Sequence, residues 1–394
     1  MRLDAASYTA DENIGSKIIT VVRTGDASGP ATVNYATSDT AGANKCDVKN
    51  GIASSRCDYL TTLGTLNFAA GETSRTIAIP IVDDAYGEGN ESFTLTLSNP
   101  TGASLGSPSS APVTINDNEM VNGINPITQA TYYVRMHYLD FLNREPDTSG
   151  WDFWTNQITA CGSDVGCTEV RRVSVSASFF LSIEFQQTGY LVERTYKASF
   201  GDATGSSTFG GSHQLSVPIV RFNEFLADTQ QITRGVIVLQ PGWEQLLQSN
   251  KIAYFAEYVQ RPRFTTAFPT SMTPAQFVDQ MNTRAGNVLS ASEQTTAINR
   301  FGSAGNTTNQ TARAQALRQV AEDRDLELAE FNRAFVLMQY FGYLRRNPND
   351  PQDTDYTGYD FWLVKLNQFG GNYINAEMVK AFISSIEYGE RFGP

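Results

Sequence analysis

The chain has 394 residues, of which 41% are hydrophobic and 18% charged, and its net charge is −12. This is the composition of a folded protein with room for two or three domains, and it excludes a disordered chain. An acidic balance without a basic cluster argues against nucleic acid and anionic membranes as partners and favours a divalent cation. No apolar run approaches the ~18 residues of a membrane span, so none is predicted.

Short β-strands are predicted throughout residues 1–118. Apolar residues alternate with period two, as at Ile77, Ile79 and Ile81, which is the pattern of a strand with one buried face. Strands at this spacing, separated by turn residues, predict an antiparallel β-sandwich. The predicted strands lie within residues 17–25, 31–39, 64–72, 76–84, 91–100 and 111–119.

Acidic residues concentrate in this N-terminal part. The segment IVDDAYGEGNE places Asp83, Asp84, Glu88 and Glu91 directly after a predicted strand. Like charges ~5 Å apart repel by about 3 kcal/mol per pair at an effective dielectric of ~20. Either these side chains extend into water, or a cation lies between them.

Five motifs carry a resemblance to a known family: YTADENIG, VNYATSD, GTLNFAAGET, IPIVDDAYGEGNESFTLTLSNPTGASLG and VTINDNE, in this order. Through them residues 1–119 closely resemble a Calx-β domain. That family has an immunoglobulin-like β-sandwich that binds Ca²⁺ at one end, and it occurs in the cytosolic loop of sodium–calcium exchangers and in secreted or surface bacterial proteins. By this resemblance the Ca²⁺ ligands are Glu12, Asp39, Asp83, Asp84, Glu88, Glu91 and Asp117.

The chemistry agrees with the resemblance, because Ca²⁺ takes about six to eight oxygen ligands. The alternative is that these acids are solvated rim residues of a metal-free sandwich. Two departures from the family stand out. Asn116-Asp117-Asn118 replaces an aspartate run, which implies fewer ions or weaker binding, and GANKCDVKNGIASSRC (42–57) is an insertion that the family usually lacks.

The four cysteines form two close pairs, Cys46 with Cys57 and Cys161 with Cys167, both in loop-like sequence. Such pairs favour two local disulfides and an oxidising compartment. Four free thiols are the alternative, and zinc is disfavoured because neither pair has CxxC spacing. The N-terminus lacks the features of a signal peptide, so an export signal would have been removed or would lie outside this chain.

The pattern changes to helices after residues 120–130, which are predicted to be a linker. Residues 131–145 have apolar residues at helical spacing before Pro146. Residues 311–346 read as one long amphipathic helix. Residues 131–394 are therefore predicted to be an all-α body. Capping boxes are predicted at Thr273 with Gln276 and at Ser290 with Glu293, and flexible breaks at 201–213 and 302–310.

An internal repeat runs through this C-terminal part. YLDFLNREPDTSGWDFW (138–154) recurs as YFGYLRRNPNDPQDTDYTGYDFW (340–362), and FFLSIEFQQTG (179–189) matches FISSIEYGERFG (382–393). The repeat predicts two related helical units, about 131–200 and 331–394, with the helical segment 220–330 between them, packed as one body. This part resembles a helical domain of unknown function in secreted bacterial proteins, distantly like phycobilisome linker domains, which implies an extracellular context.

Other candidate sites favour structural interpretations. Around Pro146 we expect Asp147 to cap a helix and Arg144 to form a salt bridge. The acids of residues 350–360 suggest a second calcium loop, but Val364 stands where an EF-hand requires Glu, and a capped surface loop is the alternative. His137 is expected to be packed and His213 exposed. No catalytic motif occurs, so an enzyme is not predicted.

The sequence therefore predicts a non-enzymatic extracellular or cell-surface protein with a structural or adhesion role. Its low charge offers little repulsion against repeated contacts, so we expect self-association, as in a filament or surface layer. A glycan or another cell-surface partner is also considered. One alternative is a glycan-binding module that uses exposed aromatics such as Trp151 or Tyr359. The other is a hydrolase of surface polymers, which would show a cleft with two facing carboxylates.

Overall fold

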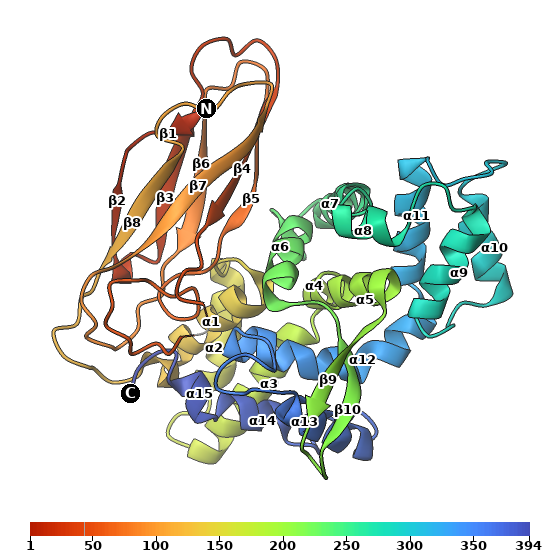
Figure 1. Cartoon of the computed structure of the whole chain (residues 1–394). Coiled ribbons are helices and arrows are strands. Elements are labelled where there is room, and N and C mark those ends of the chain that lie inside the picture. Colours follow the sequence, from red (N-terminus) through yellow and green to blue (C-terminus); the bar gives the residue numbers. More distant parts are fainter. Residues whose placement is uncertain (43) are drawn as a thin grey trace. The chain divides into compact units, whose positions relative to one another are not determined.

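A computed structural model describes residues 1–42 and 44–394 (Figure 1). The N-terminal part is the predicted β-sandwich. Neighbouring strands are antiparallel except β2 and β8, which run parallel and so depart from the wholly antiparallel prediction. One sheet has the order β1 (Arg2–Leu3), β3 (Ser16–Val22) and β6 (Ser74–Pro80), and the other β2 (Tyr8–Asp11), β8 (Ser110–Asn116), β7 (Glu91–Thr101), β4 (Ala31–Thr37) and β5 (Leu63–Phe68).

The core of the sandwich consists of the alternating apolar residues. Ile77, Ile79 and Ile81 are at most 2% exposed, as the period-two pattern predicts. On β7, Phe93 and Leu95 point into the same core, and the Phe93 ring stacks on Tyr59 with ring centres 3.9 Å apart. Burial on this scale contributes about 1.5–3 kcal/mol per large apolar side chain. The core thus fixes the strand ends from which the acidic loops leave.

The described chain divides into two compact units: residues 1–176, 343–345 and 380–394, and residues 177–342 and 346–379. This division differs from the boundaries predicted at 119 and 131, because the first helices and the C-terminal segment belong with the sandwich. A buried ion pair explains the grouping. Arg391 donates to both carboxylate oxygens of Asp140, at 2.8 and 2.9 Å, and its Nε donates to the Arg56 carbonyl oxygen at 3.0 Å.

The first unit also contains helical elements. Asp147 caps α2 as predicted, since its carboxylate accepts a hydrogen bond from the Gly150 N–H. Arg144 lies 3.5 Å from Asp147, which is the expected salt bridge. His137 is packed, at 1% exposed, between the Tyr133 carbonyl and the Ser176 hydroxyl. The helical elements of the first unit are η1 (Glu12–Ile14), η2 (Pro126–Thr128), α1 (Ala130–Leu142), α2 (Thr148–Thr159), α15 (Ile386–Gly389) and most of α3 (Val165–Phe180) and α14 (Met378–Ile383).

The second unit is mainly helical. The capping boxes at Thr273 and Ser290 are present and begin α9 and α10, as predicted. Its helices are α4 (Ile183–Gln186), α5 (Gly189–Phe200), α6 (Phe222–Thr233), α7 (Trp243–Tyr258), α8 (Pro262–Ala267), α9 (Pro274–Arg284), α10 (Ala291–Asn299), α11 (Gln310–Ala321), α12 (Arg324–Gln339) and α13 (Thr357–Gln368). The π-turn η3 (Tyr340–Leu344) begins in this unit and ends in the first unit.

Two features of this unit differ from the sequence predictions. Residues 201–213 were expected to be a flexible break, but β9 (Asp202–Ser207) and β10 (His213–Pro218) form an antiparallel hairpin, visible in green in Figure 1. The predicted helix over residues 311–346 is interrupted at Asp323, whose carboxylate caps α12 by accepting from the Asp325 and Leu326 N–H groups. Cross-strand hydrogen bonds override the Gly- and Ser-rich composition in the first place, and a side-chain cap interrupts the apolar pattern in the second.

The internal repeat is also a structural repeat. Asn143 and Arg345, at equivalent positions, both adopt a left-handed backbone with φ of 53° and 54°. Ser182 and Ser385 cap the short helices α4 and α15 in the same way. A Cβ atom on Gly150 would lie 2.2 Å from the Tyr138 hydroxyl oxygen, and one on Gly358 would lie 2.5 Å from the Tyr340 hydroxyl oxygen. The repeated motif therefore requires glycine opposite its tyrosine.

Candidate metal centre

Two groups of carboxylates lie at one end of the sandwich, where strands give way to loops. In each group the carboxylate oxygens lie within 4.8 Å of one another. The first group, cluster 1, consists of Glu12 in η1 with Asp117 and Glu119 after β8. The second, cluster 2, consists of Asp58, Asp84 and Glu88. A cavity of about 10 Å³ lies between them and is lined by Glu12, Asp58, Glu88, Gly89, Glu91, Ile115 and Asp117.

Backbone hydrogen bonds hold several of these carboxylates in place. The Asp84 N–H donates to Glu12 Oε1 at 3.1 Å, which connects the two clusters. Asp84 Oδ1 in turn accepts from the Tyr86 N–H at 2.7 Å. Asp117 accepts from the Gly89 and Glu119 N–H groups at 2.5 and 2.6 Å. The loops are therefore folded around the acids, and the acids do not extend freely into water.

Other oxygens of the same acids are buried without a hydrogen-bond partner in the part of the chain that the structure describes. Folded proteins rarely leave buried polar atoms unpaired, and such atoms indicate a missing ion or water. A group of unpaired oxygens that all carry the same sign of charge favours a cation. The unpaired oxygens are Asp83 Oδ1, Asp84 Oδ2, Glu88 Oε1, Glu91 Oε1 and Glu119 Oε2.

The electrostatics of the metal-free site are unfavourable. Burial raises the pKa of Glu12 to about 8, even though its hydrogen bond from Asp84 N opposes this, and neighbouring acids raise it further. Burial, followed by the charge of Asp58, raises the pKa of Glu88 to about 9. Burial also raises the pKa of Asp58 and Asp84 well above the usual range. A bound cation would offset both causes, since it supplies positive charge where water is excluded.

The structure places the seven predicted ligands as follows. Glu12, Asp84, Glu88 and Asp117 lie in the two clusters, Glu91 lines the cavity between them, and Asp83 contributes a buried unpaired oxygen. Asp39 lies outside both clusters. It is exposed, and its Oδ1 accepts a hydrogen bond from the Ser55 hydroxyl at 2.8 Å.

Two cluster members are absent from the predicted set, Asp58 and Glu119. Asp58 directly follows Cys57, and the sequence around it indicated only a disulfide loop. Glu119 lies two residues after the predicted ligand Asp117, and this proximity is the signal that could have identified it. The sequence around Asp58 carried no such signal.

The acids of residues 350–360, considered above as a second calcium loop, do not form a carboxylate cluster among the described residues. Arg221 pairs with Asp350 at 3.0 Å, and Arg346 pairs with Asp353 at 2.8 Å. Asp355 Oδ1 accepts from the Thr357 N–H. These acids therefore serve the capped surface loop that was the alternative.

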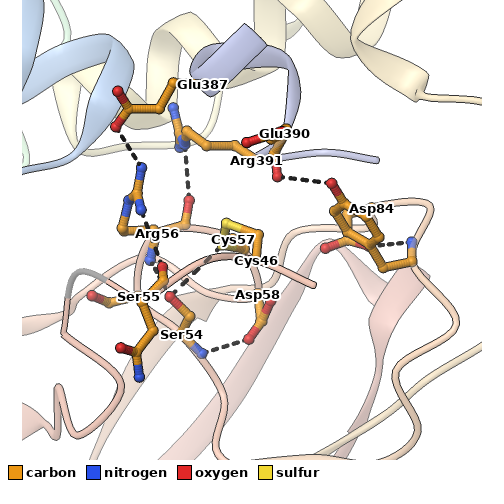
Figure 2. Close-up of a disulfide and its surroundings, with 12 residues drawn as sticks. Cys46, Ser54, Ser55, Arg56, Cys57, Asp58, Asp84, Glu387, Glu390 and Arg391 are labelled. Atoms are coloured by element: carbon orange, nitrogen blue, oxygen red, sulfur yellow. Dashed lines mark hydrogen bonds and ion pairs between the residues drawn. A yellow bond between two sulfur atoms is a disulfide. The ribbon is translucent and has the colours of Figure 1, made fainter. Parts of the chain in front are cut away.

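Both predicted disulfides are present. Cys46 and Cys57 have Cα atoms 5.8 Å apart, and those of Cys161 and Cys167 are 5.5 Å apart. The described residues contain no free cysteine. The first disulfide closes a loop that ends one residue before Asp58 (Figure 2). It therefore lies beside cluster 2, a relationship that the sequence alone did not show.

Residues 1–119 match the family model described as the Calx-beta domain, and residues 118–189 match a domain of unknown function (DUF4214). The sodium/calcium exchanger Calx of Drosophila melanogaster is 33% identical over 135 residues, which are 34% of this chain and 13% of the exchanger. The extracellular matrix organizing protein FRAS1 of Mus musculus is 36% identical over 118 residues, 29% of this chain and 3% of that protein.

Solved structures of exchanger domains are also similar. The apo form of the Calx CBD1 domain is 34% identical, with 30% of this chain and 96% of that chain covered and a TM-score of 0.27. The calcium binding domain CBD12 of CALX1.1 is 34% identical, with coverage of 30% and 45% and a TM-score of 0.26. The matches to the exchangers and FRAS1 thus span only a small part of those relatives' length.

Proposed function

We propose that the acidic end of the sandwich binds Ca²⁺. The observation that carries this proposal is the set of buried carboxylate oxygens without hydrogen-bond partners around clusters 1 and 2. The match to the Calx-beta model and the likeness to a structure titled as a calcium binding domain support the same ion. Ca²⁺ suits the site better than Mg²⁺, which requires a tight octahedron and keeps its water.

The role of the ion in this proposal is to hold loops together. Cluster 1 joins η1 to the segment after β8, and cluster 2 joins residues 58 and 84–88. Without the ion, the ionised forms of Glu12, Asp58, Asp84 and Glu88 repel one another. Binding to the folded state alone would stabilise it by about 2.7 kcal/mol at a hundredfold excess over the dissociation constant.

The test is a thermal melt of the full chain in EDTA, then in Ca²⁺, then in Mg²⁺, together with a calorimetric Ca²⁺ titration. We expect Ca²⁺ to raise the melting temperature of the unit that contains the sandwich and Mg²⁺ to raise it less. Glu12→Gln should weaken the effect. Asp39→Asn is the matched control, because Asp39 is an acid outside both clusters, and it should leave the effect intact. Equal melting temperatures in all three conditions would show that the acids are merely solvated.

For the whole protein we propose a non-enzymatic structural or adhesion role outside the cell. Two disulfides support an oxidising compartment, and the match to an extracellular matrix protein points in the same direction. In the described residues no helix is both long enough and apolar enough to cross a membrane.

Self-association is part of this proposal. Met120 and Ile124 are 98% and 90% exposed between the sandwich and α1, and such apolar side chains are suited to burial against another copy. A contact that does not close on itself produces a filament. Light scattering of the full chain in millimolar Ca²⁺ should show a mass above that of the monomer, rising with concentration. A constant monomer mass would refute the proposal.

A cleft in the second unit favours glycan binding as a second candidate function. Its volume is about 350 Å³, and aromatic and charged side chains from α5, α6, α7 and α8 line it. Tyr196 and Phe200 supply apolar walls, while Glu224 and Asp228 supply polar groups. The aromatics predicted for this role lie elsewhere. Tyr359 is fully buried, and the Trp151 indole N–H donates to the Thr131 carbonyl.

The same cleft bears on the hydrolase alternative, because it contains two carboxylates. Asp228 binds Arg261 through both oxygens, and Glu224 binds Arg263 at 2.7 Å. Carboxylates neutralised in this way are poorly placed to donate or accept a catalytic proton, so binding is the better proposal for the cleft. Titration with neutral and acidic oligosaccharides, using Arg263→Ala as the binding-deficient variant, would test it. No heat and no change in melting temperature with any sugar would refute it.

A further inference from the structure

We propose that the Cys46–Cys57 disulfide sets the Ca²⁺ affinity of cluster 2, so that the site responds to thiol reductants. This inference rests on the proposed Ca²⁺ function and adds regulation to it. The segment it concerns, residues 46–57, is called the stapled loop below.

The first support is the position of Asp58. It follows Cys57 directly, and its carboxylate belongs to cluster 2. The turn before it is tight, because the N–H groups of Cys57 and Asp58 both donate to the Ser54 carbonyl oxygen. The Ser54 N–H then donates to Asp58 Oδ2, as Figure 2 shows. The orientation of the Asp58 carboxylate, a candidate metal ligand, thus depends on the turn between Ser54 and Asp58.

The second support is that the disulfide also contacts the other arm of cluster 2. Cys46, Cys57 and Tyr86 form a small buried apolar group, at 6%, 0% and 6% exposed. The Tyr86 N–H donates to Asp84 Oδ1. A single cystine therefore packs against the residues that orient Asp58 and Asp84, two of the three members of the cluster.

The stapled loop has little regular structure of its own. After residue 50 its described attachments to β7 are the bridge between Ile52 and Ser92 and two backbone hydrogen bonds, from the Ser92 N–H to the Gly51 carbonyl and from the Ala53 N–H to the Ser92 carbonyl. Arg56 also attaches the loop to the C-terminal segment, because its side chain pairs with Glu387 and its carbonyl accepts from Arg391. Beyond the loop, the Val82 N–H donates to the Asp58 carbonyl. These backbone bonds do not depend on the disulfide. Reduction should therefore leave the sandwich folded and loosen only the turn that aims Asp58.

The chemical step is an exchange with a dithiol such as dithiothreitol. One reagent thiolate attacks a sulfur of the cystine and the S–S bond breaks. The second reagent thiol then closes the reagent into a cyclic disulfide. Two electrons pass to the protein, and Cys46 and Cys57 each end as a thiol. The cystine is buried, so this exchange requires a local opening of the loop.

Linkage makes the effect reciprocal. If the closed disulfide favours the ion, the ion must favour the closed disulfide by the same factor. Ca²⁺ should therefore slow the reduction of Cys46–Cys57. Cys161–Cys167 provides the internal control, because it joins the turn after α2 to the first turn of α3 and has no member in either cluster.

The experiment compares Ca²⁺ titrations of the full-length oxidised chain, the Cys46→Ala/Cys57→Ala variant and the Cys161→Ala/Cys167→Ala variant. Residues that support metal ligands typically change affinity by about 10- to 100-fold. We expect a loss of about tenfold in the first variant and an unchanged dissociation constant in the second. Equal affinities in all three chains would overturn the inference while leaving Ca²⁺ binding in place. Absence of binding to the oxidised chain would refute the proposed function itself.

A second measurement keeps the inference testable if the first variant fails to fold. The unmodified chain is exposed to dithiothreitol with EDTA or with Ca²⁺, and newly formed thiols are alkylated and located by peptide mass spectrometry. Labelling of Cys46 and Cys57 should be slower by about tenfold or more in Ca²⁺, and labelling of Cys161 and Cys167 should be unchanged. Equal rates for Cys46 and Cys57 in both conditions would overturn the inference.

Discussion

Replacing Arg391 by methionine should destabilise the first compact unit, because it breaks a buried ion pair and leaves one charge behind. Arg391 is 2% exposed and forms two hydrogen bonds to Asp140. It also donates to the backbone carbonyls of Arg56 and Tyr343. Asp140 is 6% exposed, so its carboxylate would stay in a poorly solvated place. The C-terminal segment would lose its main polar attachment to α1.

The expected magnitude follows from these contacts. Removing one partner of a buried ion pair typically costs 3–5 kcal/mol. Arg345 Nε remains 3.9 Å from Asp140 Oδ1 and compensates in part, so we expect the lower value, about 3 kcal/mol. For a unit of about 200 residues this corresponds to a fall of roughly 6–12 °C in melting temperature.

Differential scanning calorimetry of the full chain measures this shift. Arg75→Met is the control in the same unit, since Arg75 and Glu72 form a partly exposed pair that should contribute ~1 kcal/mol or less. The double variant Arg391→Met/Asp140→Leu should recover part of the loss because it removes both charges. A shift for Arg391→Met no larger than that for Arg75→Met would refute the assignment of this pair as the attachment of the C-terminal segment.

Three further predictions follow from the site and the repeat. The metal-free chain should lose stability as the pH rises from about 5 to 9. Glu12 and Glu88 have folded pKa values of about 8 and 9, so the folded state holds protons that the unfolded state releases above its normal pKa near 4.5. Saturating Ca²⁺ should reduce this slope, and a metal-free melting temperature that rises over that range would contradict the explanation. Gly150→Ala should cost about 1–3 kcal/mol because its Cβ would meet the Tyr138 hydroxyl, whereas Gly166→Ala, whose Cβ has only ordinary contacts, should be neutral or slightly stabilising in urea denaturation. Loss of Cys161–Cys167 should destabilise the chain by about 2–3 kcal/mol, and an unchanged midpoint of unfolding would count against this.

Much of the fold could be predicted from the sequence because its signals are local. The alternation at Ile77, Ile79 and Ile81 defined a strand, and these side chains are in the core. The capping box at Thr273 specified the start of α9, because all the atoms involved lie within one turn. Both disulfides close short loops and could also be predicted from spacing.

The sequence by itself also determined that the acids of residues 83–91 belong near Glu12 and Asp117, through the motifs of the resemblance. Only the tertiary structure decided that Asp58 joins them and that Asp39 does not. Asp39 ends a predicted strand, whereas Asp58 follows the stapled loop, and its position depends on how that loop folds against Tyr86.

Contacts between residues that lie far apart in the sequence were decided entirely by the tertiary structure. Arg391 and Asp140 are 251 residues apart, and no local pattern relates a C-terminal arginine to an aspartate in α1. The same holds for β9 and β10, whose Gly- and Ser-rich sequence has weak strand propensity and is stabilised by pairing across the hairpin. Helix and strand propensity, helix capping and apolar alternation act between residues a few positions apart. Ion pairs and strand pairing instead depend on which distant groups the fold buries next to one another.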